Sequence, residues 1–500
     1  MVSHGSGTTF DPVNWAWSPT FALALVGGKA PVRKDELIIN VRDYGALGDG
    51  VADDTTAIQA AIAASAKQLT SSGAGAGRPV FFPAGRYKVT STITVPTGTV
   101  LEGASGGVWN TNKGESRIFM SNLRSTLIAN ADQTNGDSDI EIRHLKLMGS
   151  GGNVLDFKAS GAGGTDGVTC RRILIVDCYI TNTAGNGIRF SDVQVSQIRG
   201  CYVSGNTGHS IYFQSSYDNE ITGCQIDTFQ GATGAFGGDG IHMDNTGGSA
   251  GYSDYNIIHN NFIFLCTNGI GITSGRGNVI TGNRINTCNY GIMMQTFGGA
   301  TNIERNLVTG NAFYDHGYKT GGVGVLIDGT SQYNTVSVNQ FSRETGSGFN
   351  YAVQTGATAS NNVVNGNAAR NMVQGKSFND SSSNTNTYIN NSVAERGMRV
   401  STVLTSAGVV AFDASLTNSF QVTLQANATS STLTNGHQGQ QITICWLQDA
   451  TGGRTYSWPT NCRFAGGSAP SNTTANRQTS ATFMLSGSLW MEIGRAVQVG

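Results

Sequence analysis

Ile175-Val176-Asp177-Cys178-Tyr179-Ile180 returns 23 residues later as Ile198-Arg199-Gly200-Cys201-Tyr202-Val203, and 23 residues after that as Ile221-Thr222-Gly223-Cys224-Gln225-Ile226. Similar segments begin at Ile258, Ile280 and Ile303, and weaker ones begin at Ile142, Val336 and Val364. Such self-similarity indicates a solenoid, in which each repeat buries its apolar face by stacking on its neighbours. The repeat therefore predicts both a coiled all-β architecture and which side chains share a surface.

Composition fits a long coil with a polar surface. The chain has 500 residues, 13% of them charged, a net charge of −1 and 68 glycines. Such a length exceeds one compact core but suits a coil with end pieces. A strongly basic footprint for nucleic acid is absent, so no nucleic-acid partner is expected. Abundant Gly, Asn, Ser and Thr indicate tight turns and a surface rich in hydroxyl and amide groups, which suits sugars.

The cysteines follow the repeat. Cys178, Cys201 and Cys224 share one repeat position, and Cys266 and Cys288 share another. No C-x-x-C spacing occurs, so we expect buried free thiols and neither a metal nor a cofactor. Cys445 and Cys462 could pair, but spacing alone leaves this open. In the next three repeats the first Cys position becomes Asn, which predicts inward amides that bond to one another from coil to coil: Asn261, Asn283 and Asn306.

Three regions follow from these patterns. Residues 1–36 are irregular and are expected to form an adaptor or clamp, while residues 37–395 form the coil, preceded by a capping helix with Ile58, Ile62 and Leu69 at helical spacing. Residues 396–500 carry short alternating strands and turns, which predict a C-terminal β-sandwich. No signal peptide is evident and no stretch approaches a membrane span, so an extracellular role is expected to require another route, such as release within a virus particle.

Two segments near the start of the coil carry a family resemblance. Gly48-Asp49-Gly50 with Asp53-Asp54-Thr55, followed by Phe82-Pro83-Ala84-Gly85 and Tyr87, resembles the pectate-lyase-3-like family. The resemblance implies a right-handed parallel β-helix of the kind found in bacteriophage tailspikes and polysaccharide depolymerases. Asp49, Asp53 and Asp54 are interpreted as turn and cap residues rather than catalytic ones.

The C-terminal residues carry a second resemblance. Segments between Gly439 and Trp490 resemble a module often found on phage tail proteins and associated with trimerisation or receptor contact. Together the two resemblances imply a homotrimer in the virion tail, attached through residues 1–36, whose partner is a bacterial surface polysaccharide (capsule or O-antigen).

A second strand in each repeat points to the site. If Ile188, Ile211 and Ile241 face inward, strand alternation turns Arg189, Tyr212 and His242 outward as one column, with Ser191, Gln214 and Asp244 as the next. The longest repeat, from Ile221 to Ile258, also holds extra residues on both sides of this strand, and such loops commonly line a functional groove. We therefore expect the site on this face.

Two chemistries and a non-catalytic alternative compete there. Glycoside hydrolysis needs two carboxyl groups, which Asp239 and Asp244 offer, with Glu220 or Asp218 from an adjoining strand. Asp239-Gly240-Ile241 also resembles the Asp-Gly-Ile strand of polygalacturonase-type hydrolases, where the equivalent Asp is catalytic. β-Elimination of a uronic acid instead needs a base, for which Tyr212 or His242 would serve, and a cation such as Arg189. Hydrolysis is the first hypothesis, with elimination second and glycan binding without catalysis third. The candidate catalytic residues are Asp239, Asp244, Glu220 and His242, and the candidate substrate-binding residues are Arg189, Tyr212, Gln214 and His209.

Overall fold

The structure is a computed structural model in which two units, Met1–Phe262 and Ile263–Gly500, are described separately. The described residues are 3–4, 8–9, 38–66, 78–105, 114–123, 125–160, 170–181, 184–228, 236–245, 252–296, 303–315, 322–343, 350–370, 377–382, 386–389, 391–394, 400–414, 417–436 and 438–499. Most of the proposed adaptor, residues 1–36, therefore lies outside them. Within it only β1 (Ser3–His4) and β2 (Thr8–Thr9) are described, and they pair antiparallel.

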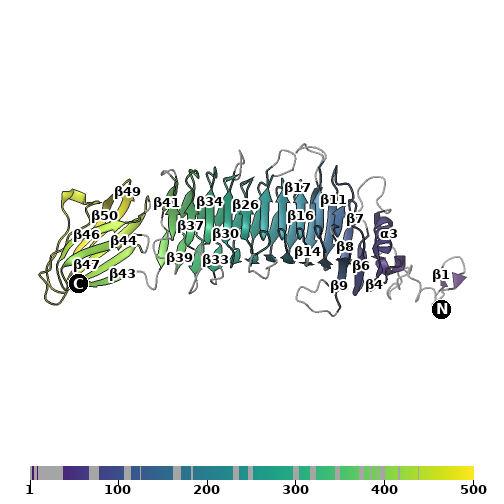
Figure 1. Ribbon diagram of the computed structural model, residues 1–500, viewed down its shortest axis with the longest axis horizontal. Helices are drawn as coiled ribbons and strands as arrows, with labels where there is room; N and C mark the ends of the chain where they lie inside the picture. The colour runs from purple at the N-terminus through teal and green to yellow at the C-terminus, as the bar shows by residue number, and fades with distance from the viewer. Residues whose placement is uncertain are drawn as a thin grey trace. The chain divides into compact units, whose positions relative to one another are not determined.

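The first unit is built from three parallel sheets (Figure 1). Sheet 1 contains β7 (Ile93–Val95), β10 (Ile128–Asn130), β13 (Leu155–Lys158), β16 (Ile188–Ser191), β20 (Ile211–Gln214) and β23 (Ile241–Asp244). Sheet 2 contains β3 (Ile39–Asn40), β5 (Val80–Phe82), β8 (Val100–Gly103), β11 (Ser138–Arg143), β14 (Cys170–Val176), β18 (Gln197–Arg199), β21 (Glu220–Thr222) and β24 (Ile257–His259), and β17 (Val193–Gln194) pairs with β14. Sheet 3 contains β4 (Asp49–Asp53), β6 (Gly85–Val89), β9 (Ser116–Met120), β12 (Lys146–Met148), β15 (Tyr179–Thr181), β19 (Tyr202–Asn206) and β22 (Gln225–Thr228). The chain visits the three sheets in turn, which makes this unit a right-handed parallel β-helix, as predicted.

A short helical region begins the β-helix. After η1 (Val41–Tyr44), α3 (Thr55–Ala66) buries Ile58 and Ile62 completely or nearly so. Asp53 accepts hydrogen bonds from the backbone N–H and hydroxyl of Thr55, whereas Asp54 accepts from the backbone N–H groups of Leu47 and Gly48. Asp49 likewise accepts from two turn N–H groups, so all three carboxylates have the structural role expected of them.

The repeat register of the first unit matches the sequence pattern. Ile142, Ile175, Ile198, Ile221 and Ile258 are successive partners on sheet 2 and are all fully buried. The thiols of Cys178, Cys201 and Cys224 are buried beside them, and the Cys224 N–H donates to Asn261 Oδ1 at 2.9 Å. The described cysteines are all free thiols, Cys445 and Cys462 included.

The second unit continues the same kind of coil. The division between the units falls within β25 (Phe262–Phe264). One sheet holds β26 (Asn268–Ile272), β30 (Tyr290–Gln295), β34 (Val323–Asp328), β37 (Tyr351–Thr355) and β40 (Phe378–Asp380). A second holds β28 (Val279–Thr281), β32 (Leu307–Thr309), β35 (Thr335–Ser337), β38 (Val363–Asn365) and β41 (Thr387–Ile389). A third holds β29 (Arg284–Asn286), β33 (Ala312–Asp315), β36 (Gln340–Arg343), β39 (Ala368–Arg370) and β42 (Ser392–Ala394), and β27 (Gly275–Arg276) pairs with β31 (Ile303–Glu304).

The register of this unit corrects one repeat assignment. Ile280 pairs with Val308 rather than with Ile303, whose partner is Gly275. The amide partner of Asn283 is accordingly Asn311, 28 residues on, whereas Asn306 belongs to a second amide ladder with Asn278 and Asn334. Sequence similarity misled here because both ladders present an Asn at a turn, and this coil is longer than its predecessors. The predicted coil-to-coil amide bonds themselves are confirmed.

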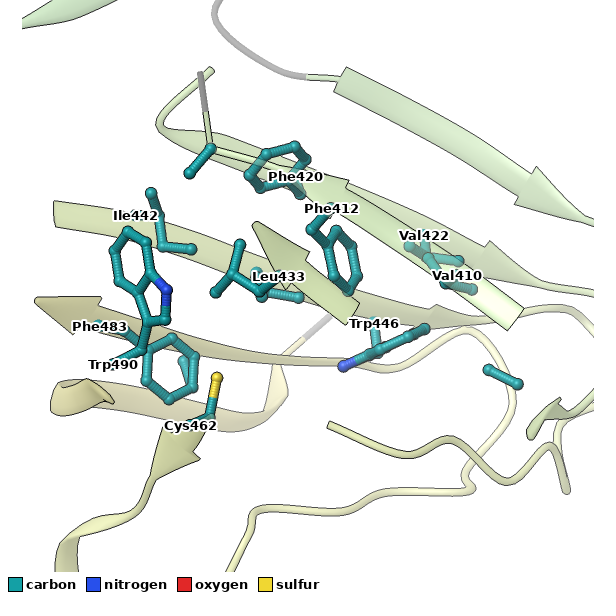
Figure 2. Packing of buried hydrophobic residues seen from close by; sticks show 14 of the residues in the cluster. Val410, Phe412, Phe420, Val422, Leu433, Ile442, Trp446, Cys462, Phe483 and Trp490 are labelled. Carbon is teal, nitrogen blue, oxygen red and sulfur yellow. The ribbon is translucent and has the colours of Figure 1, made fainter. Parts of the chain in front are cut away.

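The C-terminal residues form two sheets over a shared apolar core (Figure 2). The larger sheet has the order β43 (Val400–Leu404), β45 (Ser419–Leu424), β47 (Gln441–Gln448), β49 (Gln478–Ser486), β50 (Leu489–Val499) and β48 (Cys462–Arg463), and η2 (Ala465–Gly467) follows β48. The smaller one pairs β44 (Gly408–Asp413) with β46 (Ala428–Thr434). Phe412, Trp446 and Phe483 pack between them. Several strand pairs are parallel, which the expectation of an ordinary sandwich did not include, since sandwich strands usually pair antiparallel. Within the described part of the chain, no helix combines the length and apolarity that a membrane crossing requires.

Candidate functional site

The site rests on the outward side of sheet 1. Ile188, Ile211 and Ile241 pair in register and are fully buried, so alternation turns the intervening residues outward. The same pairing aligns Arg189 with Tyr212 and Tyr212 with His242. Ser191, Gln214 and Asp244 form the neighbouring column. The predicted columns are therefore confirmed, because fully buried isoleucines fix which side of each strand faces the core.

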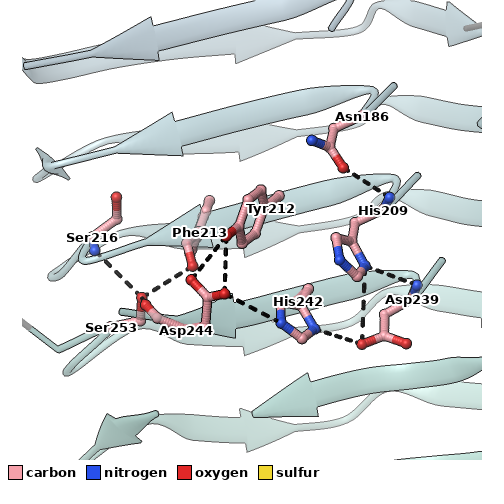
Figure 3. A network of polar contacts seen from close by, with 9 residues as sticks. All are labelled: Asn186, His209, Tyr212, Phe213, Ser216, Asp239, His242, Asp244 and Ser253. Carbon is pink, nitrogen blue, oxygen red and sulfur yellow. Dashed lines mark hydrogen bonds and ion pairs between the residues drawn. The ribbon is translucent and has the colours of Figure 1, made fainter. Parts of the chain in front are cut away.

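Hydrogen bonds join the outward residues into one cluster (Figure 3). The Tyr212 hydroxyl lies 2.9 Å from both carboxylate oxygens of Asp244. His242 lies between two carboxylates, with Nδ1 2.6 Å from Asp239 Oδ2 and Nε2 3.7 Å from Asp244 Oδ2. This His–Asp cluster, defined as His209, Tyr212, Asp239, His242 and Asp244, forms a continuous path from phenol to carboxylate to imidazole to carboxylate.

His209 completes the cluster from the turn before β20. Its ring stacks on His242 with centroids 4.1 Å apart, and its Nδ1 accepts the backbone N–H of Asp239 at 3.0 Å. Because Nδ1 is an acceptor, neutral His209 carries its proton on Nε2. Asn186 Oδ1 accepts the His209 backbone N–H at 2.8 Å and so fixes the turn.

The two imidazoles hold opposite protonation states. Burial disfavours the imidazolium of His242, but the hydrogen bonds and charges of Asp239 and Asp244 outweigh it and raise the pKa of His242 to about 9. Burial and the positive charge of His242 together lower the pKa of His209 to about 4, against the pull of both carboxylates. At neutral pH the cluster therefore contains one cationic and one neutral imidazole in stacked contact.

Access to solvent differs across the cluster. The side chains of Asp239 and Asp244 are only 5% and 9% exposed, whereas that of His209 is 29% exposed. Tyr212 is also partly exposed. Ser253, whose hydroxyl donates to the Asp244 backbone carbonyl at 2.9 Å, holds the end of β23 from behind. A ligand would thus meet the phenol and the neutral imidazole first, with the carboxylates behind them.

Arg189 and Gln214 lie beside the cluster in the two columns. Arg189 Nε is 3.3 Å from Asp156 Oδ1 on β13, and its side chain is 26% exposed. Gln214 is partly exposed at the end of β20. Both positions agree with the expectation that they face a ligand on sheet 1.

Glu220 does not join the cluster. It lies on β21 of sheet 2, where its Oε1 is 2.7 Å from His259 Nε2 and its Oε2 accepts from Gln197. Asp218 precedes the same strand. A right-handed coil turns a corner between β20 and β21, so residues close in sequence to Gln214 end on another side. The extra residues of the long repeat, 229–235 and 246–251, lie outside the described residues.

Two supporting residues were missed by the sequence analysis, although the repeat contained the signal. Asn186 precedes His209 by 23 residues, and Ser253 follows Ser216 by 37, which are the repeat steps of these coils. Comparing turn positions coil by coil would have found them.

Three residues of the cluster also form a possible cation site. Ligand atoms of His209, Asp239 and His242 all lie within 4.8 Å of one another. Two imidazoles and a carboxylate are a donor set that suits Zn²⁺. However, His209 Nδ1 and His242 Nδ1 are already engaged in hydrogen bonds, so a metal would have to displace them.

Family comparisons cover most of the chain. A model described as rhamnogalacturonase A/epimerase, pectate lyase-like, matches residues 38–293. A right-handed beta helix region matches residues 228–394, and a putative phage tail fibre C-terminal domain matches residues 405–490.

Individual relatives match over short stretches. Glucan 1,3-beta-glucosidase of Cochliobolus carbonum is 46% identical over 65 residues, 13% of this chain and 7% of the relative. Mannuronan C5-epimerase AlgE5 of Azotobacter vinelandii is 43% identical over 75 residues, 14% of this chain and 7% of the relative. The pre-neck appendage protein of Bacillus phage B103 is 31% identical over 114 residues, 22% of this chain and 11% of the relative. The chain thus spans only a small part of the curated relatives it matches.

Solved structures agree in fold. The A-module of the Azotobacter vinelandii mannuronan C-5 epimerase AlgE6 matches with a TM-score of 0.51 and 17% identity, over 71% of this chain and 99% of that one. A mutant tailspike protein of E. coli bacteriophage HK620, in complex with a pentasaccharide, matches with a TM-score of 0.55 and 11% identity, over 87% of this chain and 86% of that one. At these identities the likeness concerns the fold alone.

Proposed function

The chain belongs to the rhamnogalacturonase A/epimerase, pectate lyase-like family, and from this premise we propose that it acts on a polysaccharide through the His–Asp cluster of sheet 1. The observation that carries the proposal is the Tyr212 hydroxyl, which is partly exposed and bonded to both oxygens of Asp244. A hydroxyl that faces a ligand and has a carboxylate behind it is suited to exchange protons with that ligand.

We infer that the reaction is β-elimination at a uronic acid residue. In this reaction the Tyr212 oxygen takes the sugar C5 proton while its own proton moves to Asp244. The C5–H electron pair forms the C4–C5 double bond, and the C4–O glycosidic bond breaks. Its oxygen then receives the proton held by the Tyr212–Asp244 pair. The roles of acid and base thus fall to one pair of groups.

The surrounding residues prepare this step. Imidazolium His242, fixed by Asp239 at 2.6 Å, places a positive charge beside Asp244 and a developing phenolate. Arg189, next to Tyr212 in its column, is the cation that would neutralise the substrate carboxylate, and the Nε2–H of His209 would donate a hydrogen bond to it. Gln214 would bind a sugar hydroxyl. The epimerases among the relatives carry a C5 designation, which agrees with chemistry at that carbon.

Glycoside hydrolysis is the second candidate. Asp239 and Asp244 do lie on one face, at opposite edges of the His242 ring, as a paired-carboxylate mechanism requires. Against it, the side chains of both carboxylates are at least nine-tenths buried, and the imidazolium occupies the space between them. Elimination therefore fits the arrangement better.

One assay separates the alternatives. Elimination leaves an unsaturated sugar that absorbs in the ultraviolet, hydrolysis leaves a saturated reducing end, and a binding protein yields neither. We expect absorbance to rise with the wild-type protein and not with Tyr212→Phe. If Tyr212→Phe retains full activity while Asp239→Asn and Asp244→Asn lose it and products are saturated, hydrolysis is correct. Unchanged polysaccharide with every protein would leave only the binding role.

We further propose that the protein is a homotrimer of the virion tail that acts on a bacterial surface polysaccharide, capsule or O-antigen. The matches to a phage tail fibre C-terminal domain and to a pre-neck appendage protein support this location. Attachment is assigned to residues 1–36. Light scattering on the purified chain tests the assembly, and a monomeric mass would refute it.

A further inference from the structure

A second hollow lies on sheet 1, away from the His–Asp cluster. This cleft has a volume of about 610 Å³ and is lined by residues of β7, β10, β13 and the loop after β10: Thr92, Thr94, Thr126, Ala129, Asn130, Ala131, Asp132, Gln133, Thr134 and Asp156. No aromatic ring is among the residues that line it, and hydroxyl, amide and carboxylate groups dominate. The hollow has a simple origin, because Ala129 is the small residue between Thr94 and Asp156 on the outward side.

Strand register connects the cleft to the cluster. Thr94, Ala129, Asp156, Arg189, Tyr212 and His242 are successive partners in one outward column. With adjacent strands about 4.8 Å apart, the column spans about 24 Å from Thr94 to His242. That length exceeds a disaccharide, so a polysaccharide lying along the column would reach both places at once.

The wall of the cleft is already fixed without a ligand. Asp132 Oδ1 accepts the backbone N–H groups of Thr134 at 3.0 Å and Asn135 at 2.8 Å, which holds the loop in its turn. The Asn130 amide donates to the Asp132 carbonyl at 2.8 Å and to the Lys158 carbonyl at 2.9 Å. A preformed polar hollow loses little conformational entropy on binding.

Charge determines which sugar the cleft accepts. Its two charged lining groups are the carboxylates of Asp132 and Asp156, and Arg189 pairs with only the second. Hydrogen bonds from the backbone and side chain of Asn135 keep the pKa of Asp132 below its usual value, so that carboxylate stays ionised. A uronate placed there would meet a like charge, whereas a neutral sugar would find hydroxyl and amide partners.

We propose that the cleft is a distal subsite for a neutral sugar residue, and that the substrate is a mixed polysaccharide carrying a uronate at the cluster and neutral residues several positions away. The uronate half of this inference rests on the proposed function, whereas the neutral subsite follows from the cleft itself. Arg189, midway along the column, lies beside Asp156 on one side and Tyr212 on the other, where the charge of the substrate would change.

The test uses an array of bacterial capsular and O-antigen polysaccharides of known repeat unit, together with polygalacturonate and alginate as homopolymers of uronate. Four full-length proteins are compared: wild type, Ala129→Ile, Thr222→Ile and Tyr212→Phe. Ala129→Ile fills the cleft, and Thr222→Ile places the same side chain on β21 of sheet 2 as a matched control. We expect wild type to select mixed polymers and Ala129→Ile to bind them about tenfold more weakly, while Thr222→Ile binds normally.

The outcomes separate this inference from the proposed function. Equal binding by Ala129→Ile and Thr222→Ile, or a preference for the uronate homopolymers, would overturn the neutral subsite, and absence of any bound glycan would overturn both proposals. If Tyr212→Phe keeps forming product, the proposed function fails but the binding comparison at Ala129 still stands. Should Ala129→Ile not fold, Thr94→Val removes a lining hydroxyl at nearly constant volume, and binding equal to wild type would count against the subsite.

Discussion

His242 is expected to make the stability of the β-helix depend on pH between about 6.5 and 9. Its ordinary pKa is about 6.5, and in the folded protein Asp239 and Asp244 raise that pKa to about 9 against the cost of burial. A raised folded-state pKa means that protonation stabilises the fold. The stabilisation is fully present below pH 6.5 and is lost as pH rises through 9. His209, whose pKa is about 4, stays neutral throughout this window and adds no slope.

The size of the effect follows from the shift. A difference of about 2.5 pKa units corresponds to about 3 kcal/mol of folding free energy. Since the His242 side chain is only 13% exposed, solvent screening removes little of it. The free energy of unfolding of the wild-type protein should therefore fall by about 3 kcal/mol more than that of His242→Gln between pH 6 and pH 10.

Two measurements check this prediction. Selective ¹³C labelling of the seven histidines gives one resonance each, and the resonance missing in His242→Gln identifies His242. Its titration midpoint should lie near 9 and should fall in Asp239→Asn, where one carboxylate is neutral. Denaturant unfolding at pH 6 and pH 10 then gives the difference in stability. A midpoint near 6.5, or equal pH dependence in wild type and His242→Gln, would refute the electrostatic account of the cluster.

Three further predictions concern other parts of the molecule. Tyr212→Phe should lower kcat by about 10²–10⁴-fold with little change in glycan affinity, because the lost hydroxyl transfers a proton rather than binding substrate; steady-state kinetics decide this, and an unchanged kcat would remove Tyr212 from the reaction. Asn334→Ala should destabilise the fold by about 2–4 kcal/mol, since the Asn306 backbone N–H and side-chain amide, both bonded to Asn334 Oδ1, would be left buried without that acceptor. Denaturant titration measures the loss, and a change below about 0.5 kcal/mol would show that the amide ladder contributes little. Val195→Asn should raise stability by up to about 1 kcal/mol, because Val195 is 54% exposed and has a φ of 53°, a left-handed conformation that a β-branched residue adopts with strain and Asn tolerates; a lower melting temperature would contradict this.

Most of the fold of the first unit followed from local periodicity. A step of 23 residues with isoleucine at a fixed position predicts stacked strands, and alternation within a strand predicts which residues face outward. Arg189, Tyr212 and His242 could therefore be placed in one column from the sequence. The same approach failed at Ile303, because two amide ladders present similar letters and only hydrogen-bond pairing tells them apart.

The sequence by itself determined the coil, its inward residues and the face on which Tyr212, His242 and Asp244 gather, because a repeating backbone converts equal spacing in the chain into contact in space. Only the tertiary structure decided that Glu220 points elsewhere, that His242 lies between two buried carboxylates and that His209 stacks on it. These features depend on where the coil turns its corners and on how side chains exclude water from one another, and neither is encoded in the repeat.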